Sequence, residues 1–288
     1  MYKKILRIFS ELGMKFIPGY LAPLREVLGQ SGMKTVFDLY IGRMLFFAAT
    51  GFIVSFFWVL TFFSILGFDI LFSLAGGIIF SLLVASFILT VFHTYPYHLV
   101  SNKKRSIEAN LPFAANHMGA IAASGIAPHI MFRMLTDVKE YGEVGKEAMT
   151  IVRNTDSFGM DINSAIKDVA DRTPSQQFRQ FLYGIISTIS SGGDLRRYLQ
   201  NYAKESLTDY RLKREKYISA LSLYADFYTA VLIAAPLFFI SIMAVMSMIG
   251  GTLMGMPIHI AIQIGIYILI PMLNIFFLLF IHFTQPAV

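Results

Sequence analysis

The segment LPFAANHMGAIAASGIAPHIMF, at residues 111–132, decides the fold of this chain. It contains no Asp, Glu, Lys or Arg, and it is long enough to cross a bilayer, which takes about 20 mostly apolar residues. Its apolar residues are mostly Ala and Met, however, and Ser124-Gly125 followed by Pro128 is typical of one helix ending and another beginning. We therefore predict two helices of a soluble bundle joined by a tight turn; a further membrane span is the alternative.

The composition of the chain indicates an integral membrane protein with a polar part. Of its 288 residues, 56% are hydrophobic and 15% are charged, whereas about 25% of a soluble domain is charged. The chain has no cysteine, which excludes disulfides, thiolate metal sites and cysteine nucleophiles. Charged residues interrupt the first 16 positions, so we expect no cleaved signal peptide.

Two uncharged runs near the N-terminus predict a transmembrane hairpin. Residues 44–66 and 70–92 each have the length of a membrane-spanning helix, and only Gly67-Phe68-Asp69 separates them.

A second pair of spans is predicted after Asp226, because no charged residue follows it. A single helix over residues 227–288 would reach about 93 Å at 1.5 Å per residue, which is roughly three times the hydrocarbon thickness. Gly250-Gly251, Gly255 and Pro257 predict the break, which leaves spans near residues 227–249 and 259–283.

The basic residues indicate the orientation. Seven of the 24 Lys and Arg residues precede Gly51, the other seventeen lie from Lys103 to Lys216, and the two short connections between spans contain none. The positive-inside rule then places both termini and the middle region in the cytoplasm, with the chain in the plasma (inner) membrane. We predict four parts in an all-α fold: N-terminal cytoplasmic amphipathic helices at 1–43, a transmembrane hairpin at 44–92, a cytoplasmic helical bundle at 93–226 and a second transmembrane pair at 227–288.

Helix-capping patterns recur through the predicted bundle. Asp161 is an expected N-cap, and Thr173-Pro174-Ser175-Gln176 predicts a helix start with Thr173 as its N-cap. Gly192-Gly193 predicts a helix end, and Asp194 the next N-cap.

From Asp194 to Ile249 there is no Gly and one Pro, Pro236, so a helix either continues from the bundle into the membrane or kinks at the interface. The spacings Asp209–Lys213 and Arg211–Glu215 suit ion pairs along this helix.

The first 16 residues predict an amphipathic helix that lies either on the inner leaflet or against the bundle. Its apolar face is expected to carry Ile5, Leu6, Ile8, Phe9, Leu12 and Phe16.

No catalytic, nucleotide-binding or metal-binding motif is found in the sequence, so we expect no enzyme activity and no cofactor. The predicted spans also lack Asp, Glu, Lys and Arg, which argues against an ion-coupled carrier.

Several strings, in this order, resemble the type II secretion system F domain family, whose members are platform proteins of type II secretion, type IV pili, Tad pili and archaella. The resemblance covers most of the chain. Its single F domain is closer to the single-domain, Tad-like or archaeal branch, or to half of a longer system with two such domains. Ile126-Ala127-Pro128-His129 departs from the Leu-rich turn typical of the family. The matching strings are LREVLGQSGM at 24–33, IEANLPF at 107–113, Ser124-Gly125, SAIKDVA at 164–170, SGGDL at 191–195, and the run 211–222 leading to Pro236. The residues that carry the motif are expected to be structural: Glu108, Leu111, Pro112, Ser124, Gly125, Gly192, Gly193, Asp194 and Pro236.

The resemblance implies a non-enzymatic inner-membrane platform that couples a cytoplasmic hexameric secretion ATPase to pilin-like subunits. It also implies contacts with membrane lipid, possible pairing with a second F-domain protein or another copy of the chain, and no nucleic-acid partner. Exposed basic residues would meet an acidic ATPase surface or anionic lipid. The alternative function is a membrane channel or carrier with a regulatory cytoplasmic helical domain. The candidate docking residues are Arg196, Arg197, Arg211, Lys213, Arg214 and Lys216.

Overall fold

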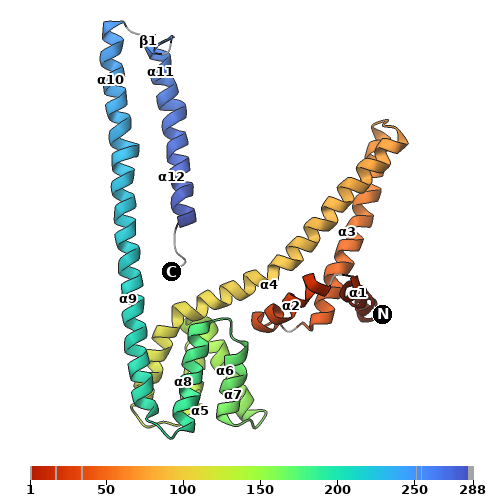
Figure 1. Ribbon diagram of the computed structural model, residues 1–288, viewed down its shortest axis with the longest axis vertical. Helices are drawn as coiled ribbons and strands as arrows, with labels where there is room; N and C mark the ends of the chain where they lie inside the picture. Colours follow the sequence, from red (N-terminus) through yellow and green to blue (C-terminus); the bar gives the residue numbers. More distant parts are fainter. Residues whose placement is uncertain (1, 17, 34, 251, 254, 285–288) are drawn as a thin grey trace. The chain divides into compact units, whose positions relative to one another are not determined.

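The computed structural model describes residues 2–16, 18–33, 35–250, 252–253 and 255–284 (Figure 1). The described chain is helical apart from one β-hairpin of two-residue strands, and it divides into two compact units at residues 1–203 and 204–288. The helices of the first unit are α1 (Tyr2–Phe16), α2 (Pro18–Ser31), α3 (Phe37–Ile65), α4 (Ile70–Ala122), α5 (Pro128–Thr136), the 3-10 turn η1 (Lys139–Tyr141), α6 (Gly142–Asp156), α7 (Ile162–Arg172), α8 (Gln176–Ser190) and the start of α9 (Leu195–Tyr228).

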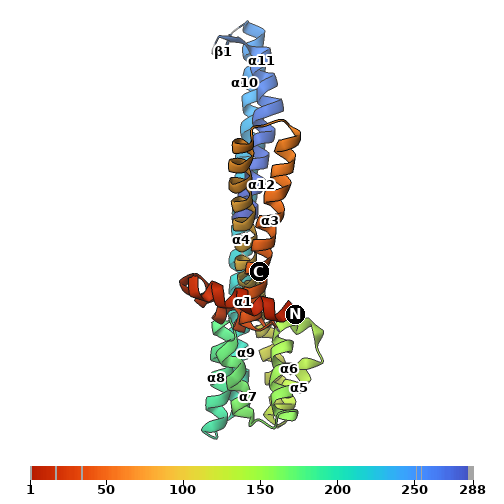
Figure 2. The ribbon, with the colours of Figure 1, turned by 90° about the vertical axis from the view of Figure 1, so that its right-hand side faces the viewer.

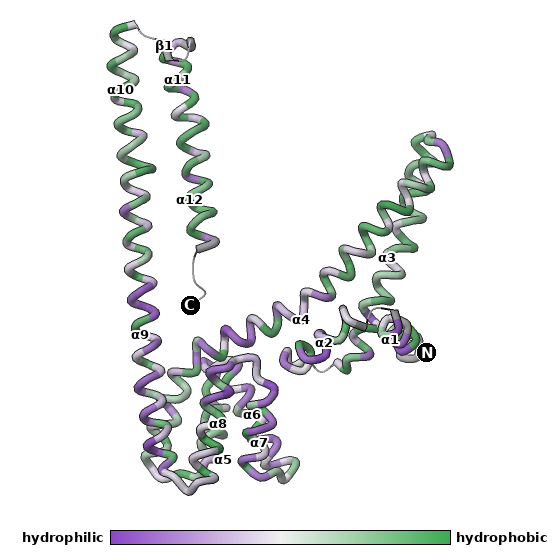
Figure 3. The backbone as a smooth tube through the Cα atoms, viewed as in Figure 1, coloured by the Kyte–Doolittle hydropathy of each residue, from purple (hydrophilic) through white to green (hydrophobic). Residues whose placement is uncertain are grey.

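Helix α3 and the first part of α4 form the predicted transmembrane hairpin. Both are long and apolar enough to cross a membrane, and most of their residues in this part are coloured as hydrophobic in Figure 3. The turn between them is closed by a hydrogen bond from the backbone N–H of Leu66 to the carbonyl of Phe62, at 3.2 Å. Gly67 follows with φ of +78°, a conformation that glycine adopts without steric cost.

Helices α1 and α2 lie across the foot of this hairpin (Figures 1 and 2). The backbones of α1 and α3 touch at Gly42, where an added Cβ atom would lie 2.1 Å from the carbonyl oxygen of Leu6. Leu21 of α2 packs with Ile41, and the hydroxyl of Tyr40 donates to the carbonyl of Phe92 on α4 at 2.7 Å. Among the described residues, α1 therefore packs on α3 of the membrane hairpin rather than against the bundle.

The buried face of α1 differs from the predicted one. Leu6 is buried and Phe9 makes an edge-on contact with Phe46, as expected, but Ile8 is 53% exposed. Ser10, four residues after Leu6, is buried instead, because the α3 contact follows the 3.6-residue period of the helix. The side chains of Ile5, Leu12 and Phe16 lie outside the described part of the chain.

The bundle consists of the last part of α4, helices α5 to α8 and the start of α9. Consecutive helices run antiparallel, and each contributes apolar side chains to one core. Burying each of the large side chains stabilises the fold by about 1.5–3 kcal/mol. Residues 111–132 fold into this core as two helices joined by a turn, as predicted. Each of the helices α4 to α9 contributes buried residues to this core, for example, in chain order, Leu111, Phe132, Ile151, Ile166, Phe181 and Leu199.

The start of α8 corrects one predicted cap. Thr173 ends α7, and Ser175 is the N-cap of α8, with its hydroxyl accepting a hydrogen bond from the N–H of Phe178 at 3.3 Å. The hydroxyl of Thr173 accepts from the N–H of Ser175 at 3.4 Å, so it orders the turn that precedes the helix. Asp161 and Asp194 cap α7 and α9 as predicted.

The second unit contains the other two helices that are long and apolar enough to span a membrane. The helical backbone continues from α9 through Ile249, and a second such helix runs from Ile258 to His282. Gly250 ends the first with φ of +80°, whereas Gly251, which was predicted to share this break, lies outside the described residues. The elements after α9 are η2 (Thr229–Ala234, a π-helix), α10 (Ala235–Ile249), β1 (Thr252–Leu253), β2 (Met256–Pro257), α11 (Ile258–Ile264), η3 (Gly265–Leu269, a π-helix) and α12 (Ile270–Thr284).

Candidate functional site

Three turns lie at the end of the bundle where α4 terminates (Figure 1). Because the helices alternate in direction, the α4–α5, α6–α7 and α8–α9 turns share this end, and the α7–α8 turn lies at the other, where α4 enters. Each of the three contains a glycine with positive φ: Gly125 at +71°, Gly159 at +64° and Gly192 at +67°. We call residues 123–127, 157–161 and 191–194, with the adjoining first turn of α9, the distal end.

The α4–α5 turn explains two residues of the motif. The N–H of Ser124 donates to the carbonyl of Ile121 at 3.0 Å, and that of Gly125 to the carbonyl of Ala122 at 3.1 Å. Pro128 then takes the first position of α5, where its missing N–H costs no hydrogen bond. Ser124 and Gly125 are exposed and contribute nothing to the core, so these two residues serve to turn the backbone.

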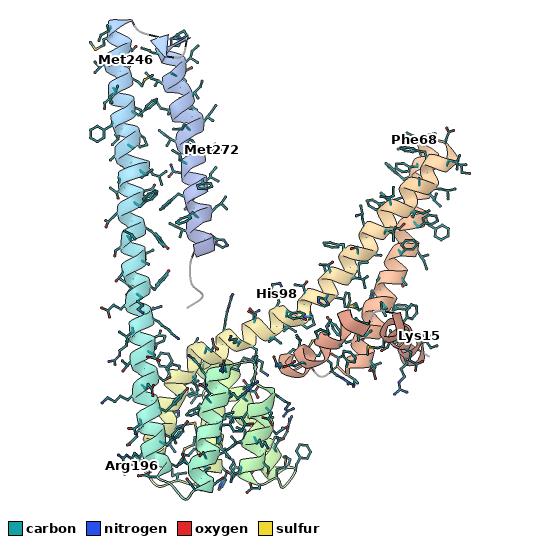
Figure 4. All side chains as sticks on the ribbon, in the orientation of Figure 1. Lys15, Phe68, His98, Arg196, Met246 and Met272 are labelled. Carbon is teal, nitrogen blue, oxygen red and sulfur yellow. The ribbon has the colours of Figure 1, made fainter. Side chains whose placement is uncertain are left out.

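The α8–α9 turn presents the first two candidate docking residues. The N–H of Gly193 donates to the carbonyl of Thr188 at 2.8 Å, and Asp194 accepts from the N–H of Arg197 at 3.0 Å. Arg196 and Arg197 are exposed, and neither guanidinium has an ion-pair partner in the described part of the chain. Figure 4 shows Arg196 at the distal end. Two cations with unused hydrogen-bond donors can bind carboxylates.

The other four candidate docking residues belong to the second unit. All four are exposed on α9 beyond Ala203. The predicted ion pairs Asp209–Lys213 and Arg211–Glu215 are absent among the described residues, because a spacing of four permits such a contact without enforcing it. These four residues are Arg211, Lys213, Arg214 and Lys216.

The α6–α7 turn carries a feature that the sequence analysis missed. Phe158 is 69% exposed and Met160 is 37% exposed, although both belong to a tightly hydrogen-bonded turn. The sequence did contain a signal for this exposure. Phe158 is a large apolar residue next to Gly159, which favours a turn, and it belongs to no helical apolar stripe.

The opposite end of the bundle contains the family-motif residues of the IEANLPF string at 107–113. Glu108 accepts a hydrogen bond from the hydroxyl of Ser175 at 3.2 Å and lies 3.9 Å from the ammonium of Lys104, so it joins α4 to the start of α8. Leu111 and Pro112 are buried beside it. This end also forms an open cavity of about 600 Å³, lined by Lys104, Pro174, Gln176, Arg179, Gln180 and Tyr183.

The polar groups of this cavity are largely engaged within the bundle. Arg179 donates to the carbonyls of Ala170 and Thr173 at 3.1 and 3.0 Å, which caps the end of α7. The hydroxyl of Tyr183 donates to Asp171, and this hydrogen bond, with a smaller contribution from burial, raises the pKa of Tyr183 above its usual value. Among the described residues, no group of three or more His, Asp or Glu side chains is placed to hold a metal ion.

Pro236 follows a local change in helix geometry in the second unit. The π-helix η2 ends at Ala234, two residues before Pro236, and η3 ends at Leu269, two residues before Pro271. Proline lacks an N–H, and its ring clashes with the carbonyl four residues earlier. Those carbonyls belong to Leu232 and Tyr267, inside the two π-turns, so the wider turns relieve both clashes.

The comparisons with known proteins agree with this architecture. Residues 114–256 match the sequence family described as "Type II secretion system (T2SS), protein F". An uncharacterized protein of Methanocaldococcus jannaschii is 26% identical over 197 residues, which cover 67% of this chain and 33% of that protein. Flagella accessory protein J of the same organism is 26% identical over 170 residues, with coverages of 58% and 30%.

Flagella accessory protein J of Methanococcus voltae is 21% identical over 145 residues, covering 50% of this chain and 26% of that protein. The matched part of the chain thus spans about a third of the length of the curated relatives. No solved structure matches the chain.

Proposed function

Since residues 114–256 belong to the type II secretion system protein F family, we propose that this multi-pass membrane protein is a non-enzymatic platform of an archaellum- or pilus-type assembly machine. In this role it joins a cytoplasmic hexameric secretion ATPase to pilin-like subunits in the membrane. The related flagella accessory proteins J support the archaellum-type branch of such machines.

The extent of the family domain is the observation that carries the proposal. Residues 114–256 begin within the bundle part of α4 and end after α10, so one domain includes both a charged bundle and an apolar helix. A protein that relays work from a soluble motor to membrane subunits needs both parts in one structure. The sequence contains no Walker-type phosphate loop, so the motor must be another protein.

Helix α9 is the proposed route for the work. It starts at the distal end beside Arg196, and its helical backbone continues without a break through Ile249. A motor that binds the exposed start of this helix would act on an element that also forms a membrane segment.

Charge reversal at the distal end tests the proposal. The protein is co-expressed with the hexameric secretion ATPase of the same organism and purified in detergent. We expect the wild type to retain the ATPase, and R196E/R197E to reduce the retained amount at least tenfold, because two cations would face acidic groups. The control is K139E/K167E, which reverses two other exposed lysines of the bundle.

Absence of a complex with the wild-type protein would overturn the proposed coupling. Equal retention by R196E/R197E and the wild type would remove these two arginines from the docking surface while leaving the coupling in place.

A further inference from the structure

Helix α4 contains a proline, Pro96, close to the point where it leaves the membrane hairpin. The predicted span of α4 ends at Phe92, and Figure 4 labels His98, two residues after the proline, on the part of α4 that leads to the bundle. Proline has no N–H to donate, and its ring clashes with the carbonyl four residues earlier, which here belongs to Phe92. The helix therefore lacks one backbone hydrogen bond at this point, and helices bend most readily where such a bond is missing.

The carbonyl that loses its donor is satisfied by a neighbouring helix. The hydroxyl of Tyr40, on α3, donates to the carbonyl of Phe92 at 2.7 Å. Tyr40 is 5% exposed and Pro96 is buried, so this hydrogen bond is shielded from water. Membrane helices tolerate proline because a side chain of another helix can satisfy the freed backbone group. The hydroxyl of Tyr40 thus replaces the missing N–H and ties α4 to α3 where the hydrogen bonding of α4 is interrupted.

The parts of α4 before and after the proline are held by different partners. Before it, the ring of Phe92 stacks on that of Phe47 of α3, with 5.7 Å between the ring centroids. After it, the ammonium of Lys103 pairs with the carboxylate of Glu147 on α6 at 2.5 Å, and the two side chains are only 12% and 13% exposed. Residues 93–102 therefore connect a part that is fixed to the hairpin with a part that is fixed to the bundle.

Helix α2 runs beside this connecting stretch. Leu24 and Leu28 of α2 form one buried cluster with Tyr40. A Cβ atom added to Gly32, which follows α2, would lie 3.7 Å from the ammonium nitrogen of Lys103. Apolar packing of this kind has no preferred direction, whereas a hydrogen bond does. The hydroxyl of Tyr40 is therefore the contact that fixes the geometry of the proline site.

We propose that Pro96 is a joint at which the bundle moves relative to the membrane hairpin, and that the hydroxyl of Tyr40 is the latch that holds this joint closed. Opening the latch leaves the carbonyl of Phe92 without a donor, so the closed state is favoured until a force acts on the bundle. Such a joint would let the bundle follow a cytoplasmic motor while the hairpin stays in the membrane. That use rests on the proposed function, whereas the joint itself does not.

A double-mutant cycle tests the latch. Amide hydrogen exchange of residues 93–102 is measured by mass spectrometry on the full-length protein in detergent. We expect Y40F to raise the exchange rate about fivefold, because one hydrogen bond to the Phe92 carbonyl is lost. In P96A the new N–H of residue 96 can donate to that carbonyl, so Y40F/P96A should exchange at the rate of P96A, within about twofold.

The matched control for the cycle is T61V. It removes another hydroxyl of α3, one that donates to the carbonyls of Phe57 and Trp58 in its own helix at 3.0 and 2.8 Å. Because those carbonyls belong to α3 itself, T61V should leave the exchange of residues 93–102 at the wild-type rate.

A pair of spin labels tests the joint. The chain has no cysteine, so K15C on α1 and K167C on α7 place one label on the hairpin side and one on the bundle, both at exposed positions. We expect one narrow distribution of label-to-label distances with the native Tyr40, and a distribution about twice as wide in Y40F. In Y40F/P96A the distribution should be narrow again, because the helix is then continuous through residue 96.

Three results would overturn the inference. Equal exchange in Y40F and the wild type would show that Tyr40 does not latch α4. An effect of Y40F that is as large in P96A as in the wild type would show that the hydroxyl does not compensate for the proline. An unchanged distance distribution in Y40F would show that Pro96 is not a joint. Unchanged gel-filtration profiles show that the variants are folded. No ATPase enters these measurements, so their failure and that of the proposed function are distinguishable.

Discussion

At the scale of single residues, Ser175 connects two features of the bundle. Its hydroxyl accepts from the N–H of Phe178 and donates to Glu108, and its side chain is fully buried. Replacing a helix N-cap by alanine costs about 0.5–2 kcal/mol. We expect S175A to expose the α7–α8 turn and to raise the rate of tryptic cleavage after Arg172 about 2- to 30-fold in the native protein.

The control for this experiment is S187A, which removes a hydroxyl from an exposed position inside α8. Its cleavage rate should stay at the wild-type value. Equal rates for S175A and S187A would show that the cap and the Glu108 contact contribute nothing to the stability of this turn.

At the scale of elements, the helices and their ends could be predicted where the residues of a short segment alone determine them. Uncharged runs such as residues 44–66 are long enough to span a membrane, and glycines such as Gly192 can take the positive φ that ends a helix. The start of α8 was predicted wrongly because Thr173 and Ser175 are both competent caps two residues apart. Only the core position of Phe178 selects the second.

Contacts between distant segments could not be derived from local patterns. The close approach of α1 to Gly42 depends on how two helices cross, and nothing in the spacing of either helix specifies that crossing. Phe158 was missed for a related reason, because its exposure becomes evident only when the bundle core is known to exclude it.

The paired π-turns give a prediction about the membrane helices as elements. In P236A, residue 236 gains an N–H that can donate to Leu232, so the α-helical pattern can replace η2. One added hydrogen bond stabilises by about 1 kcal/mol. We expect amide hydrogen exchange in residues 229–236 to slow about fivefold in detergent. L237A, which changes an exposed side chain but not the backbone, should leave exchange unchanged.

Faster or unaltered exchange in P236A would mean that Pro236 is not the cause of the wide turn. The polar contact between Tyr228 and Asn274, where the hydroxyl donates to the amide oxygen at 3.3 Å, would then be the next element to test.

At the scale of the whole molecule, the proposed role depends on which side of the membrane carries the bundle. All 24 basic residues lie outside the two short connections between spans, so the positive-inside rule predicts that both connections lie outside and residues 93–226 in the cytoplasm. The chain has no cysteine, and a single introduced thiol therefore reports its own position.

A membrane-impermeant maleimide applied to intact cells should label D69C and H259C, which lie at exposed positions beside the two connections. It should label S157C and S191C, at the distal end, only after the cells are made permeable. The two pairs control for each other, because each shows that the reagent reacts where the other is protected. Labelling of S157C or S191C in intact cells would place Arg196 out of reach of any cytoplasmic ATPase. In that case the family domain could not couple to such a motor through its distal end.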